Sequence, residues 1–282
     1  MIGIVDVGGM SAWDATVAVK KTYFAPLAIR AGHHHFSVKP VHFHTSVPVH
    51  DAVQAALSAP ADTVISLAPT FDKARVHKWV GNLAPQVYRA ARPGTIVLRH
   101  GGHPVLVHAR PGHELRPFPT WIRIRDALTT GSRSTIVAPF RVLTAPDVKP
   151  GPIIVIHRAA NRLVLFRGER YVRSFAVATG QAIYPTPLGQ FAIVVKEKNP
   201  WWYPPTQDAW AKGLQPVPPG PGNPLGTRWM GLSAPGVGIH GTDEPWSIGH
   251  SESHGCIRMQ VPDAEWLYKR VRVGTPVFII PR

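Results

Sequence analysis

The second half of this 282-residue chain is a series of short strand-like runs separated by turn residues, and this pattern limits the fold more than any other feature. The runs cover residues 153–157, 162–166, 172–179 and 190–196, and a last core strand is expected at 276–280. Many short strands at close spacing are typical of a β-sandwich or a barrel-like sheet. We therefore expect a mainly β domain over residues 150–282, with one or two helices, the last of them beginning near Pro262.

The first half predicts small α+β modules, expected at residues 1–59 and 60–149. Ser11 is placed to cap a short helix, with Asp14 three residues further on. Residues 72–88 carry apolar side chains at helical spacing, and residues 95–108 predict a hairpin with a glycine pair at its turn. Two Asp-Ala helices, at 49–57 and 124–128, are each followed by an expected strand, at 63–69 and 134–139. Prolines and a glycine within residues 147–152 predict the linker to the second half.

The formal net charge is +15, from 31 Lys and Arg against 16 Asp and Glu. Such a surface favours anionic polymers as partners. The charge is spread over both halves, whereas a nucleic-acid-binding protein more often concentrates it on one element with aromatic residues interleaved. We therefore expect no nucleic-acid partner. No run approaches the ~18 apolar residues of a membrane span, and residues 1–9 lack the basic and apolar regions of a signal peptide.

Residues 199–236 contain nine prolines together with Trp201, Trp202, Trp210 and Trp229. A long irregular segment inside a compact domain is usually a functional lid or binding loop. If the segment were a surface loop without function, its several exposed indole side chains would have no explanation. We expect this loop to lie over a substrate groove.

Cys256 is the only cysteine, so it cannot form an internal disulfide and is either a small buried residue or a nucleophile. A catalytic thiol needs a neighbouring imidazole or dipole to hold it as a thiolate. His240 is far enough upstream to lie on an adjacent strand and face Cys256. The amides of Gly255 and Cys256 are candidate donors to the oxyanion that forms on attack.

The segment around these residues resembles the signature of the YkuD-type L,D-transpeptidase family. The resemblance includes Ile239-His240-Gly241-Thr242, Pro245, Ile248-Gly249 and Ser253-His254-Gly255-Cys256-Ile257-Arg258, and Thr186-Pro-Leu-Gly-Gln-Phe191 resembles the family's Thr-Pro-x-Gly-x-Phe motif. It extends over residues 152–281. Residues 1–149 resemble, over shorter motifs, the peptidoglycan-binding modules that precede such domains.

The resemblance implies a role for each residue of the site. Cys256 would be the nucleophile, His240 the general base, and the backbone carbonyl of Gly241 the third member. Relatives often have Ser where this chain has Gly241, so only the carbonyl can orient the imidazole. Ser253, His254 and Gly255 would shape the oxyanion and substrate pocket. Arg258 would either hold the loop or meet a substrate carboxylate.

The resemblance also implies a reaction. Cys256 would attack the third residue of a peptidoglycan stem peptide, release the terminal D-Ala and pass the acyl group to an amine of a second stem, which leaves a 3-3 cross-link. Water as acceptor would give an L,D-carboxypeptidase, and a protein amine would give an anchoring enzyme. No cofactor is implied. The partners would be stem peptides and anionic wall polymers, in the cell envelope outside the cytoplasm, although no export signal is visible.

Three other readings compete with this one. His240, His254 and Cys256 are possible zinc ligands, but they lack the second spaced pair of a zinc site, so no metal is expected. A papain-like protease has its cysteine before its histidine, the reverse of this order. A non-catalytic wall-binding protein would leave Cys256 without a role. The remaining histidine-rich region, residues 33–50, is expected to be solvated surface.

Overall fold

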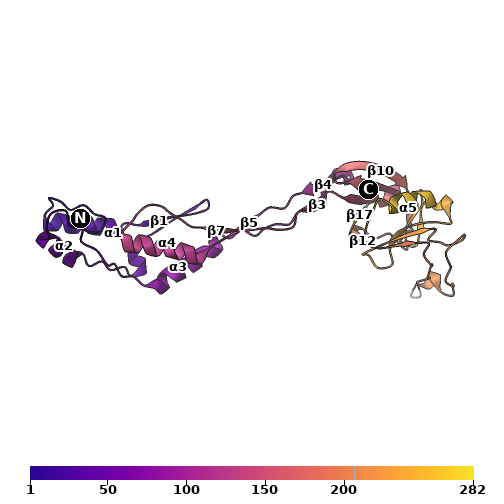
Figure 1. Ribbon diagram of the computed structural model, residues 1–282. Helices are drawn as coiled ribbons and strands as arrows, with labels where there is room; N and C mark the ends of the chain where they lie inside the picture. The colour runs from indigo at the N-terminus through magenta and orange to yellow at the C-terminus, as the bar shows by residue number, and fades with distance from the viewer. Residues whose placement is uncertain (206–207) are drawn as a thin grey trace. The chain divides into compact units, whose positions relative to one another are not determined.

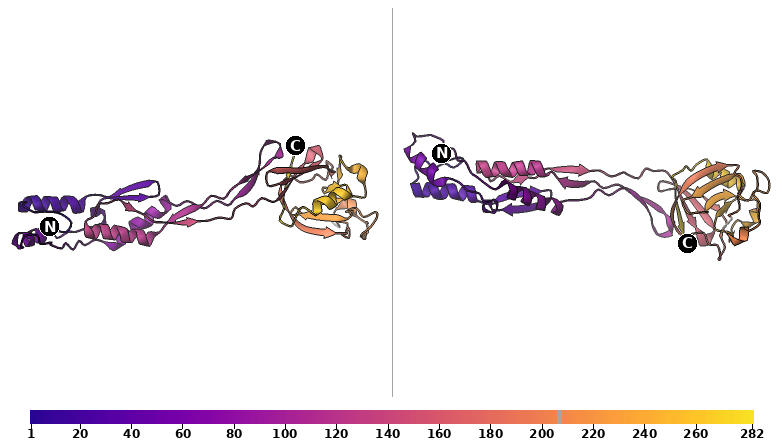
Figure 2. Two further views of the ribbon diagram at one scale, coloured as in Figure 1. Left: turned by 45° about the horizontal axis from the view of Figure 1, so that its top comes forward. Right: turned by 90° about the horizontal axis from the view of Figure 1, so that it is seen from below.

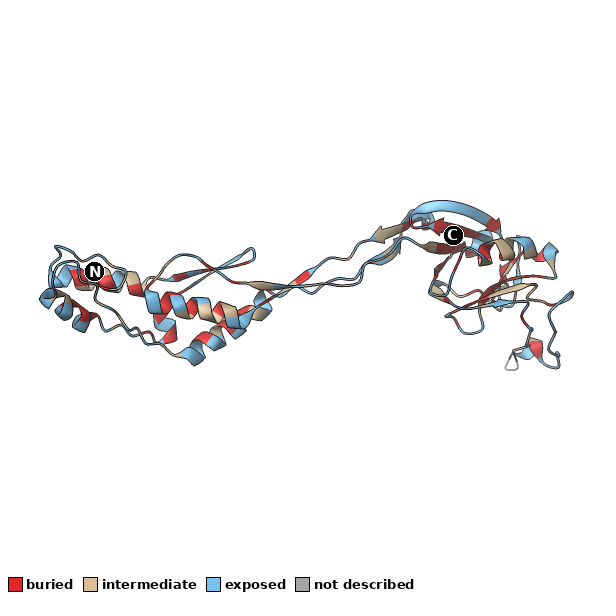
Figure 3. Cartoon of the chain, viewed as in Figure 1, coloured by how far each residue is buried: buried red, intermediate tan, exposed pale blue. Residues whose placement is uncertain are grey.

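The protein, seen here as a computed structural model that describes residues 1–205 and 208–282, consists of two compact units (Figure 1). The first unit comprises Met1–Pro93 and Ala109–Pro146, and the second comprises Gly94–His108 and Asp147–Arg282. Each unit has buried residues of its own (Figure 3). Within the described residues, no helix has the length and apolar character needed to cross a bilayer.

The first unit is α+β, as predicted. Ser11 caps its first helix, because the Ser11 Oγ accepts from the Asp14 amide at 3.1 Å and donates to the Asp14 carboxylate at 2.6 Å. Asp72 caps the third helix, because its carboxylate accepts from the Ala74 amide at 2.9 Å and the Arg75 amide at 3.1 Å. Ile124 of the fourth helix is fully buried in the core it shares with the third. The elements are α1 (Ala12–Phe24), β1 (Leu27–Ala31), β2 (His34–Val38), η1 (Pro40–Phe43), α2 (Val49–Ser58), α3 (Lys73–Gln86), β5 (Gly112–Leu115), α4 (Pro117–Thr130), β6 (Ile136–Val137) and β7 (Phe140–Leu143).

The strand predicted at residues 63–69 is wrong. Only Ile65 pairs there, in an isolated bridge with Ile2. The segment has strand character in its sequence, but within the described residues only Ile65 forms a β-bridge with residues 1–3, donating to the Met1 carbonyl and accepting from the Gly3 amide, so no ladder forms. The strand predicted at 134–139 is confirmed as β6, which lies parallel to β1. The expected division between modules near residue 60 stays a prediction.

The second unit is built on an eight-stranded mixed sheet in the order β10-β9-β8-β17-β12-β13-β14-β16. Strands make up most of the regular structure of this unit (Figure 2), which confirms the mainly β fold. Most neighbours are antiparallel, and the pairs β8–β17 and β14–β16 are parallel. The elements are β3 (Thr95–Leu98), η2 (His100–Gly102), β4 (Pro104–Val107), β8 (Pro152–His157), η3 (Arg158–Ala160), β9 (Arg162–Arg167), β10 (Arg170–Ala176), β11 (Thr179–Gly180), β12 (Gly189–Lys198), η4 (Ala209–Ala211), β13 (Arg228–Leu232), β14 (Gly238–Gly241), η5 (Pro245–Ser247), β15 (Ser251–Ser253), β16 (Ile257–Met259), α5 (Val261–Tyr268) and β17 (Pro276–Ile280).

The main core of the second unit lies between this sheet and α5. Ile239 of β14, Ile257 of β16 and Leu267 of α5 are all fully buried there. The proline-rich stretch 199–236 is only partly irregular, because β13 lies within it and pairs with both β12 and β14. Trp229 is therefore a strand residue and not part of an exposed loop, which corrects the sequence reading.

The hairpin β3–β4, predicted from sequence, packs against the second unit and not against the first. Its apolar residues Ile96, Leu98 and Leu106 cover a second cluster on β8, β9 and β17, in which Phe166 is nearly buried. At the turn, a Cβ added to Gly102 would lie 2.9 Å from the His157 ring and from an Ile280 methyl carbon. Because no side chain fits there, the glycine allows the turn to sit flat on the sheet.

Candidate active site

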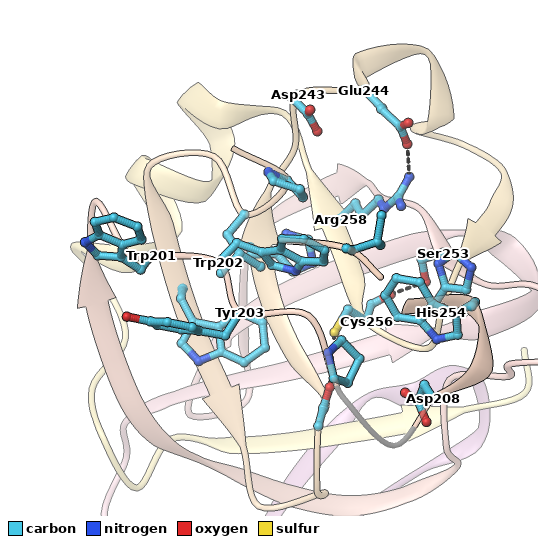
Figure 4. Close-up of a pocket in the computed structure, with 18 of the residues that line it drawn as sticks. Trp201, Trp202, Tyr203, Asp208, Asp243, Glu244, Ser253, His254, Cys256 and Arg258 are labelled. Carbon is cyan, nitrogen blue, oxygen red and sulfur yellow. Dashed lines mark hydrogen bonds and ion pairs between the residues drawn. The ribbon is translucent and has the colours of Figure 1, made fainter. Parts of the chain in front are cut away.

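A pocket of about 640 Å³ opens in the second unit beside β14 and β16 (Figure 4). Both predicted catalytic residues, Cys256 and His240, line it, together with aromatic residues of the 199–225 stretch. The described part of the 199–236 stretch therefore lies along a groove, as predicted, while residues 206 and 207 lie outside the described residues; that the groove binds substrate stays a prediction. The lining consists of Glu197, Trp201, Trp202, Tyr203, Pro205, Asp208, Trp210, Leu214, Pro224, Leu225, Trp229, Pro235, Gly236, His240, Asp243, Glu244, Ser253, His254, Cys256 and Arg258.

Strand register explains why Cys256, His240 and Arg258 share this pocket. Strands β14 and β16 are parallel, with Ile239 opposite Ile257 and His240 opposite Arg258. Side chains alternate between the faces of a strand, and the two isoleucines face the core. His240 and Arg258 therefore face the pocket, and Cys256, two residues before Arg258, faces it as well.

The imidazole of His240 is oriented by the backbone. It is 4% exposed, and its Nδ1 lies 2.5 Å from the carbonyl oxygen of Gly241. A carbonyl can only accept, so Nδ1 carries the proton and Nε2 is left as an acceptor. Burial lowers the pKa of His240 to about 4, against the opposing effects of the Gly241 and Pro224 carbonyls. His240 is thus neutral at pH 7 and able to accept a proton.

The thiol of Cys256 is also held neutral. Its Sγ donates to the carbonyl of Gly236 at 3.4 Å. Burial raises the pKa of Cys256 to about 11, although the backbone of Gly238 and the charge of Arg258 act in the opposite direction. The resting site is therefore a thiol and an imidazole. This corrects the expectation of a stored thiolate, because burial disfavours both charged forms more than any neighbour stabilises them.

The Ser253–Cys256 loop is held by a short chain of hydrogen bonds. The Ser253 Oγ donates to the Cys256 carbonyl at 2.6 Å and accepts from the Gly255 amide at 3.2 Å. The Thr186 Oγ1 donates to the Gly255 carbonyl at 3.0 Å and accepts from the Gly180 amide at 2.8 Å. Since the Gly255 amide is already engaged, the Cys256 amide is the remaining candidate of the pair expected to donate to an oxyanion.

Two glycines of the motif are needed for different reasons. Gly255 has φ +108°, and an added Cβ would meet only the Tyr184 carbonyl oxygen at an ordinary contact distance of 3.8 Å, so its backbone conformation and not crowding favours glycine. Gly241 lies against another stretch of backbone, because an added Cβ would be 3.4 Å from the Gly226 Cα and 3.1 Å from a Val261 methyl carbon. A serine at position 241 would press on both neighbours.

His254 contacts two aromatic rings although it is exposed. Its ring stacks on Trp210 at 3.9 Å between centroids and 16° between planes, and it lies 5.1 Å from the ring of Tyr184. Burial lowers the pKa of His254, as does the charge of Arg258, while Asp208 and Glu244 oppose the shift. The stack joins the proline-rich segment directly to the Ser253–Cys256 loop.

Arg258 is paired within the protein. Its guanidinium donates to the Glu244 carboxylate at 2.5 Å, as Figure 4 shows, and its side chain is 17% exposed. Two roles were considered for Arg258 from the sequence, and its contact with Glu244 supports the one in which it holds the loop. The pair also fixes the turn after Gly241 against β16.

The sequence reasoning missed Tyr184, Asn223 and the structural role of Trp229. Trp229 covers Gly238, where an added Cβ would lie 2.2 Å from the indole. Asn223 is buried and ties several loop carbonyls together. Thr186 was noted only as part of a motif, although the shared Thr-Pro-x-Gly-x-Phe pattern could have flagged it as part of the site.

The histidine-rich region of the first unit is solvated, as expected. His33, His34, His35, His42, His44 and His50 are all exposed. Across residues 1–205 and 208–282, no three His, Cys, Asp or Glu side chains gather as a metal site requires.

Comparison with known proteins identifies the family. Residues 151–279 match the L,D-transpeptidase catalytic domain known as YkuD. YqjB of Bacillus subtilis, a protein named as an L,D-transpeptidase, is 32% identical over 149 residues, which cover 51% of this chain and 80% of YqjB. YkuD of Bacillus licheniformis, also named as an L,D-transpeptidase, is 35% identical over 136 residues, or 48% of this chain and 69% of that protein.

Among solved structures, an L,D-transpeptidase from Mycobacterium smegmatis aligns with a TM-score of 0.41 and 16% identity, over 71% of this chain and 85% of that one. The site and the sequence relatives define the class. The chain belongs to the YkuD-type L,D-transpeptidase family.

Proposed function

We propose that the protein forms 3-3 cross-links in peptidoglycan through a thioester on Cys256, with release of the terminal D-Ala of the donor stem. The observation that carries the proposal is that one pocket holds the Cys256 thiol together with a neutral His240 whose Nδ1 is tied to the Gly241 carbonyl. This arrangement leaves Nε2 able to take the thiol proton at the moment of attack.

The chemistry would proceed in two halves. In the first, Sγ bonds to the carbonyl carbon of the third stem residue while Nε2 of His240 takes the thiol proton, and the carbonyl electron pair moves to the oxygen. The Cys256 amide stabilises this oxyanion. The carbon–nitrogen bond to D-Ala then breaks, and the departing nitrogen takes the proton from His240. A thioester and free D-Ala result.

In the second half, an amine of another stem peptide attacks the thioester carbon. His240 takes a proton from the attacking nitrogen and returns it to the sulfur as the carbon–sulfur bond breaks. Cys256 is restored as a thiol, and the new amide is the cross-link. Since the substrate is a wall polymer, we place the protein outside the cytoplasm, with its net charge of +15 favouring anionic wall polymers and the first unit acting as a wall-binding module.

The test is incubation of the purified protein, beside Cys256→Ala, with disaccharide-tetrapeptide, followed by mass spectrometry of the products. A dimer that has lost one D-Ala, absent with the variant, is expected. Tripeptide without dimer would instead mean an L,D-carboxypeptidase. Unchanged substrate with retained wall binding would reject catalysis in favour of a binding protein.

A carbapenem provides an independent check on the nucleophile. We expect the intact mass of the wild-type protein to rise by the mass of the drug, and that of Cys256→Ala to stay unchanged. An unmodified wild type, under conditions that acylate a control L,D-transpeptidase, would argue against Cys256 as the acylated residue.

A further inference from the structure

Two exposed aromatic rings form one wall of the pocket, on the side away from His254 (Figure 4). Trp201 is 50% exposed and Tyr203 is 68% exposed, and their rings stack at 6.3 Å between centroids and 24° between planes. Residues two apart on an extended chain face the same way. The pair therefore presents flat apolar rings to solvent inside a substrate pocket, where they add nothing to the core of the second unit.

This wall is built rigidly. Trp202 and Val217 bond each other through both backbone amides at 2.9 Å, which closes the segment into a bridge. Beneath it Asn223, only 1% exposed, donates through Nδ2 to the carbonyls of Pro200 at 2.9 Å and Pro218 at 3.0 Å. A buried amide with its donors satisfied by the loop's own carbonyls fixes the loop in one shape. The rings are thus positioned before any ligand arrives.

The polar groups that line the same pocket restrict what can bind. Glu197 and Asp243 line the same pocket, and neither forms an ion pair within the described part of the chain. Arg258 is already occupied by Glu244. A pocket with a flat apolar wall and carboxylate acceptors that are unpaired within the described residues suits a ligand with apolar C–H faces and hydroxyl or amide donors at its rim, which describes an N-acetylated sugar ring.

The connectivity of the substrate provides an independent reason. If the third stem residue sits at Cys256, three extended residues lead back roughly 10 Å to the sugar that carries the stem. That sugar must meet the pocket wall away from the nucleophile, and Trp201 and Tyr203 form such a wall. We propose that Trp201 and Tyr203 are a glycan subsite, which binds a sugar ring of the strand that bears the donor stem. The inference rests on the proposed function for the identity of the sugar.

The kinetic test compares kcat/KM for disaccharide-tetrapeptide with kcat/KM for the sugar-free tetrapeptide. We expect the wild type to favour the sugar-bearing donor on the order of 10-fold, the size of one or two good ring contacts. The double variant Trp201→Ala/Tyr203→Ala should bring this ratio close to one. Trp246→Ala is the matched control, because Trp246 is 68% exposed and does not line the pocket. An equal ratio in the wild type and the double variant would overturn the proposal.

A binding test separates this inference from the proposed reaction. Cys256→Ala, which cannot turn over substrate, is titrated with N-acetylglucosamine tetramer while tryptophan fluorescence and heat are followed. We expect saturable binding that is lost when Trp201 and Tyr203 are also replaced and kept when Trp246 is. Absence of binding would refute the glycan subsite even if cross-linking is observed. The glycan subsite would also be refuted if a diamine bound in place of the sugar and salt abolished that binding, because the pocket would then be a cation site.

Discussion

The pH dependence of Cys256 reactivity tests whether the resting site is a neutral pair or a stored thiolate. Cys256 is the only cysteine, so a thiol-specific reagent reports on this residue alone. A small neutral dithiodipyridine, followed by absorbance, is suitable because only the thiolate attacks a disulfide. The folded protein and the same protein in urea are measured from pH 5 to 10.

The expected magnitude follows from the raised pKa. Burial raises the pKa of Cys256 from its ordinary value of 9.0 to about 11, so the thiolate fraction near pH 7 falls about 100-fold. A thiolate whose thiol has a higher pKa is intrinsically a better nucleophile, so the rise of two pKa units increases the rate constant of the thiolate roughly 10-fold. The net expectation is reaction about 10-fold slower than in the unfolded chain, with the rate rising tenfold per pH unit up to pH 10. The unfolded chain should level off near pH 9.

A rate that is flat from pH 6 upward would refute this reasoning, because it would mean that an imidazolium–thiolate pair already exists. Restricted access cannot imitate either result, since it slows the reaction equally at every pH. His240→Gln gives a second check. The neutral pair predicts little change in the rate at pH 7, whereas an ion pair predicts a large loss.

Three further predictions concern stability and loop support. The pKa of His240 falls from 6.5 to about 4 on folding, so the folded state is stabilised by up to about 3 kcal/mol above pH 6.5, and this stabilisation is lost as the pH falls towards 4. The melting temperature of the wild type should therefore fall over this pH range, and the fall should be smaller in His240→Gln. Thr186→Val should lower kcat, because it removes the hydrogen bond to the Gly255 carbonyl, and should lower stability by about 1–3 kcal/mol. Thr186→Ser keeps the hydroxyl and should retain most of the activity. Equal kcat values for the two variants would show that this hydrogen bond does not support catalysis. Gly102→Ala should lower the melting temperature more than Gly101→Ala. Both glycines have φ +78°, but only at Gly102 would an added methyl group meet crowded neighbours, which should lower the stability by about 1–3 kcal/mol. Similar losses for the two variants would show that the packing of the turn is unimportant.

The local pattern of apolar and turn residues was sufficient to predict most strands and the last helix of the second unit. Its strands alternate or run as continuous apolar stretches between turn residues, and β17 and α5 were placed close to their observed ends. The candidate site was predictable because the spacing of His240 and Cys256 matches one parallel strand pair, so the register brings both to one face. The first unit was harder, since the sequence at 63–69 has strand character without a neighbour to pair with.

What could not be predicted depends on contacts between distant segments. The Trp210–His254 stack joins residues whose sequence neighbourhoods give no sign of each other. The neutral state of Cys256 likewise follows from burial, which a motif does not report. The hairpin β3–β4 was recognised as a hairpin, but nothing local to residues 95–107 tells which unit it covers.

That hairpin also determines how the two units are connected. The chain passes from the first unit to the second at residue 94, returns at 109 and passes again at 147, so three covalent strands join them. A single proteolytic cut in any one strand would leave the units attached. Neither unit is therefore one continuous stretch of sequence, because residues 94–108 belong to the second unit although they lie between two segments of the first.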